Sequence, residues 1–129
     1  MIKVTILYCR APGSKFDFDY YLNTHMPLSI ARLGMAMDAI IVERVLDPGP
    51  PWPAPAYTAI CSFLCESREA YEAAFMPHMA ELQADIPNYT DVEQVVLISE
   101  IAIDYRRNST EAAQEKKWLT RIGVKTGMG

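Results

Sequence analysis

The sequence predicts an α+β domain in which two strand–helix–strand halves form one four-stranded antiparallel sheet with two helices on one face. The first observation behind this prediction is the order of the segments, because strand-like and helix-like hydrophobic patterns follow one another identically in the two halves. The second is a short internal repeat at a separation of 50 positions, which relates Tyr21 to Tyr71 and Met26-Pro27 to Met76-Pro77. A duplicated βαβ unit of this size is typical of the ferredoxin-like fold.

Length and composition limit the classes of protein that fit this chain. Half of its 129 residues are hydrophobic, which is enough for one domain with a substantial core. The net charge is −4 and no basic patch is interleaved with aromatic residues, so a nucleic-acid partner is not expected. The longest apolar runs are strand-sized and shorter than the roughly 18 residues of a membrane span, so no membrane partner is expected either.

The N-terminus and the cysteines predict the compartment. The chain begins directly with a strand-like segment and shows no cleavage-site pattern, so no signal peptide is predicted. Cys9, Cys61 and Cys65 form an odd set without CxxC spacing. Together these features predict a cytoplasmic protein with reduced thiols.

Four segments have the composition and alternation of strands. Residues 2–9 alternate between two faces, and apolar, β-branched segments at 38–46, 57–65 and 92–105 are predicted to form the other three strands. Between the second and third strands, residues 47–55 hold five of the nine prolines. Such a segment cannot pair in the middle of a sheet, which predicts a stiff, extended loop.

The first predicted helix carries a histidine on its apolar side. Asp17 is the predicted N-cap, and Pro27 is predicted to kink or stop the helix because it disfavours helical geometry at the preceding residue. A shorter helical piece follows at residues 28–33 and ends at Gly34. The apolar face of the first part contains Phe18, Tyr21, Leu22 and His25.

The second predicted helix begins at Ser67, which acts as its cap and is followed by Glu residues in the first turn. Like the first helix, it is interrupted by a proline, here Pro77, and it is predicted to end near Pro87. Its predicted buried stripe is Tyr71, Phe75, Met79 and Leu82.

The predicted sheet is too apolar on its second face for a single copy of the chain. Both faces of the strand at residues 92–105 are apolar, and residues 40–42 also lack polar alternation. Two helices cover only one side of a sheet, and an uncovered antiparallel face is normally polar. We therefore expect a second copy of the chain to cover this face, sheet against sheet, in a symmetric homodimer.

The C-terminal extension at residues 106–129 differs in charge from the domain at residues 1–105. It holds six basic and two acidic residues, a net charge of +4, against −8 for the rest. A short helix at residues 110–119, anchored by Trp118 and Leu119, is predicted to pack on the domain or on the partner subunit. A frayed terminus is the alternative.

His25 is the strongest candidate for proton transfer, because an imidazole can take and give a proton near neutral pH. The alternative is a packed histidine that donates to a nearby carbonyl. Cys61 and Cys65 lie on the same face of one predicted strand and, without further ligands nearby, are expected to be buried thiols and not a zinc site. No phosphate loop or dinucleotide motif is present, so no metal or cofactor is expected.

Three segments resemble the EthD family of small proteins, which is named after an ethyl tert-butyl ether degradation locus. These segments are residues 2–8 (IKVTILY), 16–21 (FDFDYY) and 25–28 (HMPL), and the likeness extends over residues 1–105. The resemblance implies the dimeric α/β-barrel fold, in which the sheets of two ferredoxin-like subunits close into a barrel with a cavity. It also implies that His25 acts as a general acid and base, because the same histidine is assigned this role in some related lactone isomerases and polyketide-tailoring enzymes.

The first functional hypothesis is a cofactor-independent isomerase, dehydratase or oxygenase. Its substrate would be a small carbonyl, lactone or phenolic compound in an apolar cavity between the helices and the sheet, with His25 as general acid and base. Candidate hydrogen-bond partners for the ligand are Tyr8, Tyr21 and Tyr57. Candidate apolar walls are Phe63 and Trp52, with the proline-rich loop as an edge or lid.

The second hypothesis is a non-catalytic protein. In this interpretation the barrel sequesters a small apolar molecule and serves as a binding or accessory protein of a catabolic pathway. A haem-binding variant would use His25 as the axial ligand. Substitution of His25 separates turnover from binding.

Overall fold

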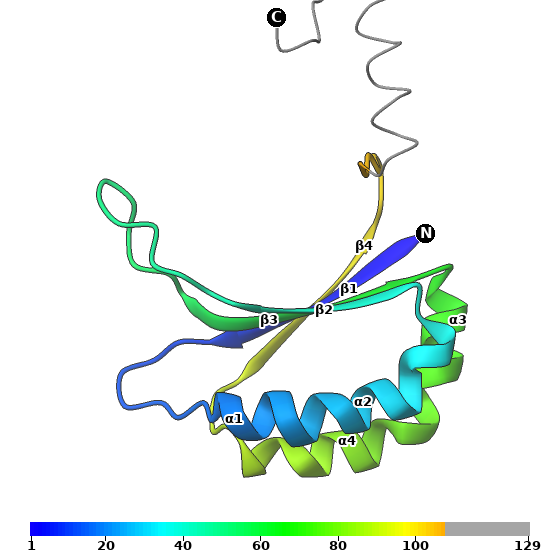
Figure 1. Cartoon of the computed structure of the whole chain (residues 1–129), viewed down its shortest axis with the longest axis horizontal. Coiled ribbons are helices and arrows are strands. Elements are labelled where there is room, and N and C mark those ends of the chain that lie inside the picture. The colour runs from blue at the N-terminus through cyan, green and yellow to red at the C-terminus, as the bar shows by residue number, and fades with distance from the viewer. Residues whose placement is uncertain (108–129) are drawn as a thin grey trace, which may run out of the picture.

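The computed structural model describes residues 1–107 and has the predicted ferredoxin-like architecture. The strands are β1 (Ile2–Cys9), β2 (Ala39–Arg44), β3 (Tyr57–Cys65) and β4 (Gln94–Glu100). They form one antiparallel sheet in the order β2-β3-β1-β4. Two helical stretches lie together on one side of this sheet, as Figure 1 shows. The predicted fold class is therefore confirmed for the subunit, with β1 and β3 as the central strands.

The first helical stretch continues through Pro27, so the predicted stop, one of the two alternatives given for this proline, is wrong. It consists of α1 (Phe18–Tyr20), a π-helical segment (Tyr21–His25), α2 (Met26–Leu33) and a 3-10 turn (Gly34–Ala36). In the π segment the amide of Met26 donates to the carbonyl of Tyr21, five residues back. A proline has no amide to donate and its ring clashes with the carbonyl four residues back. The wider π turn fits this proline without ending the helix.

Two further expectations for this stretch are resolved by the structure. The N-cap is confirmed, because the Asp17 carboxylate accepts from the amide of Tyr20 at 3.1 Å. Leu22, which was predicted on the buried face, is exposed, whereas Tyr21 and His25 are buried. In the π turn the buried positions follow at four-residue intervals from Tyr21 through His25 to Ser29 and Leu33.

The second helical stretch is interrupted at Pro77, as predicted. It consists of α3 (Arg68–Phe75), a 3-10 turn (Met76–His78), α4 (Met79–Asp85) and a second 3-10 turn (Ile86–Asn88). Ser67 caps α3 by accepting from the amide of Ala70 at 3.1 Å. The interruption turns the chain, so that α4 runs beside α2 under the sheet while α3 lies at one end (Figure 1).

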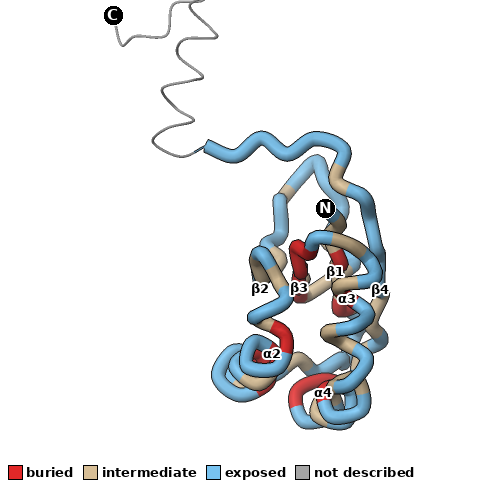
Figure 2. Tube along the Cα trace, turned by 90° about the vertical axis from the view of Figure 1, so that its right-hand side faces the viewer, coloured by how far each residue is buried: buried red, intermediate tan, exposed pale blue. Residues whose placement is uncertain are grey.

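The core lies between the helices and the central strands (Figure 2). Val4 and Tyr8 of β1 face the helices together with their cross-strand neighbours Phe63 and Ala59 of β3. Buried residues of the helical layer pack against these strand residues and complete the core: Tyr21, Met26, Leu33, Tyr71, Leu82 and Tyr89. The pattern that predicted the strands therefore also selected the face that the helices cover.

The fourth strand is shorter than predicted, ending at Glu100 instead of Tyr105. Its ladder with β1 stops there because Glu100 is paired with Ile2, the first residue of β1. Only the amide of Ile101 continues, donating to the carbonyl of Met1 at 3.1 Å. Most of the predicted C-terminal extension, including its expected helix at residues 110–119, lies outside the described residues.

The face of the sheet opposite the helices carries apolar side chains that nothing in the described part of the chain covers. Leu97 of β4 is 50% exposed and Ile41 of β2 is 47% exposed. Leu97 is paired with Thr5, on the face of β1 that points away from the helices. Apolar surface exposed in this way usually marks an interface.

Candidate functional site

His25 is buried in the helical layer, although it is a polar residue. Its side chain lies in the π segment, with an exposed fraction of 6% for the residue as a whole. The imidazole stacks on the Tyr21 ring at 5.7 Å between centroids, and it contacts the Tyr89 ring at 4.6 Å. Two aromatic rings therefore fix the plane of the imidazole.

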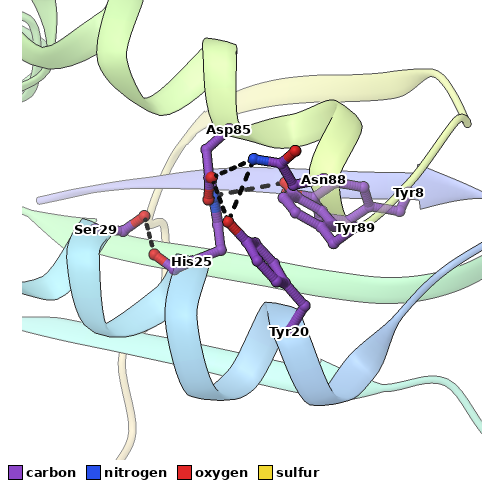
Figure 3. Close-up of polar contacts among 7 residues, drawn as sticks. All are labelled: Tyr8, Tyr20, His25, Ser29, Asp85, Asn88 and Tyr89. Carbon is purple, nitrogen blue, oxygen red and sulfur yellow. Dashed lines mark hydrogen bonds and ion pairs between the residues drawn. The ribbon is translucent and has the colours of Figure 1, made fainter.

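Asp85, the last residue of α4, holds one nitrogen of this imidazole. His25 Nδ1 lies 2.9 Å from Asp85 Oδ2. The other carboxylate oxygen accepts from the Tyr20 hydroxyl at 2.6 Å and from the Asn88 amide at 2.9 Å (Figure 3). The carboxylate thus has three donors, and it joins the end of α4 to α1 and the π segment of the first helical stretch.

These donors keep Asp85 ionised. Burial alone would raise the pKa of Asp85, but the hydrogen bonds from Tyr20, Asn88 and His25 outweigh it and lower the pKa below its usual value. An ionised carboxylate only accepts hydrogen bonds. The hydrogen between the two groups therefore sits on His25 Nδ1, and in the neutral imidazole Nε2 carries the lone pair.

The second nitrogen of His25 lies next to a pair of buried phenols. Nε2 is 3.5 Å from the Tyr89 hydroxyl, which in turn is 2.8 Å from the Tyr8 hydroxyl. Burial raises the pKa of both Tyr8 and Tyr89, so both phenols stay protonated at neutral pH. Tyr89 is brought to this place by the segment after α4, which is bonded to the start of the first helix through Asp17 N–H and the Tyr89 carbonyl at 2.7 Å.

A cavity of about 140 Å³ lies between the helices and the sheet beside these residues. Its walls are mostly apolar, and the lining also includes Gln83 of α4 and Gln94 and Val96 of β4, of which Gln83 and Val96 are exposed. An apolar cavity of roughly 150 Å³ in another protein is large enough to bind benzene. The lining residues include Ile6, Tyr8, Tyr21, His25, Met26, Leu33, Cys61, Phe63, Tyr71 and Leu82.

The structure brings four of the six predicted site residues together at this cavity. Tyr8, Tyr21, His25 and Phe63 all line it. Tyr57 and Trp52 do not. Tyr57 is the first residue of β3, and Trp52 is 66% exposed in the proline-rich loop. That loop extends away from the helices (Figure 1) and supplies no lining residue, so it is not placed as a lid.

The residues that sequence reasoning missed are those that arrange His25: Asp85, Tyr89, Tyr20 and Asn88. Three of them surround Pro87, with Asn88 and Tyr89 at three and four residues after Asp85. This spacing puts polar groups on one side of a helix end, which was the available signal. Nothing in the linear sequence indicates that this end lies against His25, 60 positions earlier.

Cys61 also lines the cavity, but its thiol is not activated. Burial raises the pKa of Cys61 to about 12, so the group is a neutral thiol at physiological pH. Within residues 1–107, no group of three or more His, Cys, Asp or Glu side chains is placed to hold a metal ion.

Comparison with known proteins confirms the resemblance inferred from the sequence. The model of the EthD domain matches residues 14–93. An EthD-like protein from Ralstonia eutropha is 41% identical, with a TM-score of 0.74, and the match covers 81% of this chain and 94% of that one. An ethyl tert-butyl ether degradation family protein from Bacillus halodurans is 20% identical, with a TM-score of 0.56 and coverage of 78% and 98%.

A ferredoxin-like protein from Bacteroides fragilis, described as dimeric and of unknown function, shares the fold at 9% identity. Its TM-score is 0.52, and the match covers 78% of this chain and 95% of that one. No protein with a curated description matches the chain. Among the described residues, no helix is both long and apolar enough to cross a membrane.

Proposed function

Because this chain belongs to the EthD family, we propose that it binds a small carbonyl, lactone or phenolic compound and acts on it as a cofactor-independent enzyme. His25 is the general acid and base in this proposal. The observation that carries it is the hydrogen bond between His25 Nδ1 and the Asp85 carboxylate at 2.9 Å, at the wall of an apolar cavity. Such a pair orients an imidazole and supports the positive charge that it gains when it accepts a proton.

The arrangement separates the tasks of the two nitrogens. Asp85 keeps the hydrogen on Nδ1, which leaves Nε2 to accept a proton from the ligand. The Tyr89 hydroxyl lies next to Nε2, and the Tyr8 hydroxyl lies next to that of Tyr89. Each of these phenols can both donate and accept a hydrogen bond. Because these phenols stay neutral, their role in the reaction is to donate hydrogen bonds and not to act as phenolate bases.

The test is proton exchange on a panel of monocyclic lactones and phenolic ketones in D₂O, followed by ¹H NMR. The wild-type protein is expected to exchange hydrogens next to the carbonyl of at least one compound, and His25→Ala to lose this exchange while it still binds that compound. The other histidine supplies the matched control, because His78 does not line the cavity. His78→Ala should exchange at the wild-type rate. Absence of exchange across the panel would overturn the proposal.

The alternative function is a binding or accessory protein without catalysis. One observation favours it: both imidazole nitrogens already have partners inside the protein, Nδ1 at Asp85 and Nε2 at the Tyr89 hydroxyl. In this case His25 would serve packing, and the cavity would only sequester its ligand. Binding that survives His25→Ala, with no exchange in the wild-type protein, is the result that this alternative expects.

We also propose that the working form is a homodimer in which the apolar sheet faces of two subunits meet. The exposed Leu97 and Ile41 on the face opposite the helices support it, as does the dimeric state of the Bacteroides fragilis neighbour. A symmetric pair is the commonest way for a soluble chain to cover such a face. The cavity lies on the helical side of the same sheet.

A further inference from the structure

One polar atom at the cavity lacks a well-formed hydrogen bond within the protein. The Tyr21 hydroxyl is fully buried and has no hydrogen-bond partner of good geometry, although the Tyr8 hydroxyl and the Cys61 thiol are its polar neighbours and Tyr21 is one of the lining residues. Burial raises the pKa of Tyr21 far above its usual value, and the neighbouring Cys61 and Tyr8 add to this effect. The phenol is therefore a neutral O–H donor beside an apolar space.

An unsatisfied buried hydroxyl is unfavourable, and native proteins leave few of them. The other aromatic hydroxyls around His25 are all used: Tyr8 and Tyr89 bond to each other, and Tyr20 bonds to Asp85. A phenylalanine at position 21 would keep the ring contacts with His25, Tyr8 and Tyr89 without the cost of the hydroxyl. The Tyr21 hydroxyl therefore retains an O–H that no well-formed hydrogen bond within the described residues uses.

We propose that Tyr21 is a ligand-binding residue whose O–H donates to the carbonyl oxygen of a monocyclic ketone or lactone held against His25. The inference rests on the proposed function and names its substrate class. The size of the ligand follows from the cavity, which at about 140 Å³ has room for one six-membered ring. The Tyr21 ring stacks on the His25 ring with 5.7 Å between centroids, so one small molecule in the cavity can contact both residues.

The chemistry of this arrangement is enolisation. His25 Nε2 accepts the proton from the carbon next to the carbonyl, and the C–H electron pair forms a C=C bond. The carbonyl π electrons move to the oxygen, where the Tyr21 O–H stabilises the negative charge. Return of the proton from His25 to the same carbon gives hydrogen exchange. In a ring that also has a C=C bond conjugated with the enolate, return of the proton to the γ carbon moves the double bond and completes an isomerisation without any other reactant.

The test compares two ligands of nearly equal shape, cyclohexanone and methylenecyclohexane, which differ in an oxygen acceptor. Their dissociation constants are measured by NMR titration of the wild-type protein, Tyr21→Phe and Tyr57→Phe. We expect the wild-type protein to prefer cyclohexanone, and Tyr21→Phe to lose about three- to tenfold of that preference, as expected for one hydrogen bond. Tyr57→Phe is the matched control, because Tyr57 lies outside the cavity, and it should keep the preference.

Binding is read without turnover, so this test and the proton-exchange test fail separately. If Tyr21→Phe loses the preference while the wild-type protein exchanges no hydrogens, the ligand assignment stands and the catalytic proposal fails. An unchanged preference in Tyr21→Phe would overturn the role of Tyr21. Failure of both ring compounds to bind the wild-type protein would overturn the ligand class.

Discussion

Asp85 is the residue that fixes which nitrogen of the buried imidazole carries the hydrogen. A histidine between two aromatic rings could use either nitrogen, but a carboxylate at 2.9 Å from Nδ1 leaves only Nε2 for a ligand. The carboxylate is itself held by Tyr20 and Asn88. Asp85 is therefore a positioning residue, which acts through His25.

The pH dependence of folding should report Asp85. Its pKa is lowered in the folded state, so its contribution to stability is fully present above the usual value of 3.8 and is lost as the pH falls through the lower folded value. We expect the wild-type protein to lose stability in acid below about pH 4, and Asp85→Asn to lose less over the same interval because the titrating carboxylate is gone. Urea unfolding at several pH values measures this. Parallel profiles for the two proteins would contradict the assigned shift.

Tyr21→Phe should raise the stability of the ligand-free protein. Removal of a buried hydroxyl without a partner relieves a penalty of about 1 kcal/mol, which corresponds to an increase in Tm of about 4 °C for a domain of this size. Thermal unfolding followed by circular dichroism measures the change. The matched substitution Tyr8→Phe removes a hydroxyl that is bonded to Tyr89 and should lower Tm instead. A lower Tm for Tyr21→Phe would mean that the hydroxyl has a partner within the protein.

At the scale of elements, the first helical stretch combines a cap, a π turn and a proline. The cap positions the first turn, which carries Tyr20, and the π turn carries Tyr21 and His25. π turns occur frequently at functional sites. Here the wide turn fits Pro27 within a continuous helix, so that Met26, Ser29 and Leu33 beyond it also face the core. A stop at Pro27 would have left His25 at a helix terminus.

The cap should contribute measurably to stability. Asp17→Ala removes the acceptor for the Tyr20 amide and is expected to cost about 1 kcal/mol. Asp19→Ala is the matched control, because Asp19 is exposed in the same first turn but is not the cap, and a carboxylate there gains about 0.3–1 kcal/mol from the helix dipole. Urea unfolding gives both values. Equal losses for the two variants would show that charge and not capping stabilises this turn.

At the scale of the whole molecule, the helices and the second face of the sheet have different roles. The helical side encloses the cavity, and the opposite side exposes apolar residues where a solitary subunit would need polar ones. One sheet thus serves both a ligand site and, in our proposal, a subunit interface.

A charge on the open face should separate the subunits. Leu97→Glu places a carboxylate where two sheets would meet, and burial of an unpaired charge is strongly unfavourable. We expect the wild-type protein to have the mass of a dimer by light scattering and Leu97→Glu to have that of a monomer. Ile30→Glu is the matched control, because Ile30 is also 50% exposed but lies on α2, on the other side of the subunit. A monomeric wild-type protein would refute the proposed interface.

Much of the fold could be read from local patterns. Strand alternation, the caps at Asp17 and Ser67 and the interruption at Pro77 are each decided within a few residues, and each is confirmed. The continuous helix through Pro27 was not predictable, because a proline disfavours an α-helix but does not reveal that a π turn will replace it. The fourth strand was predicted too long for a similar reason, since its end depends on where its partner β1 begins.

By itself the sequence determined the subunit architecture, the family and the candidacy of His25, because helix and strand periodicity and a short motif are properties of neighbouring residues. Only the tertiary structure decided what surrounds His25. The carboxylate of Asp85, the phenols of Tyr89 and Tyr8 and the unpartnered hydroxyl of Tyr21 meet there because α4 runs beside α2 under the sheet. Contacts between residues 60 or more positions apart depend on how the two layers pack, which no local pattern contains.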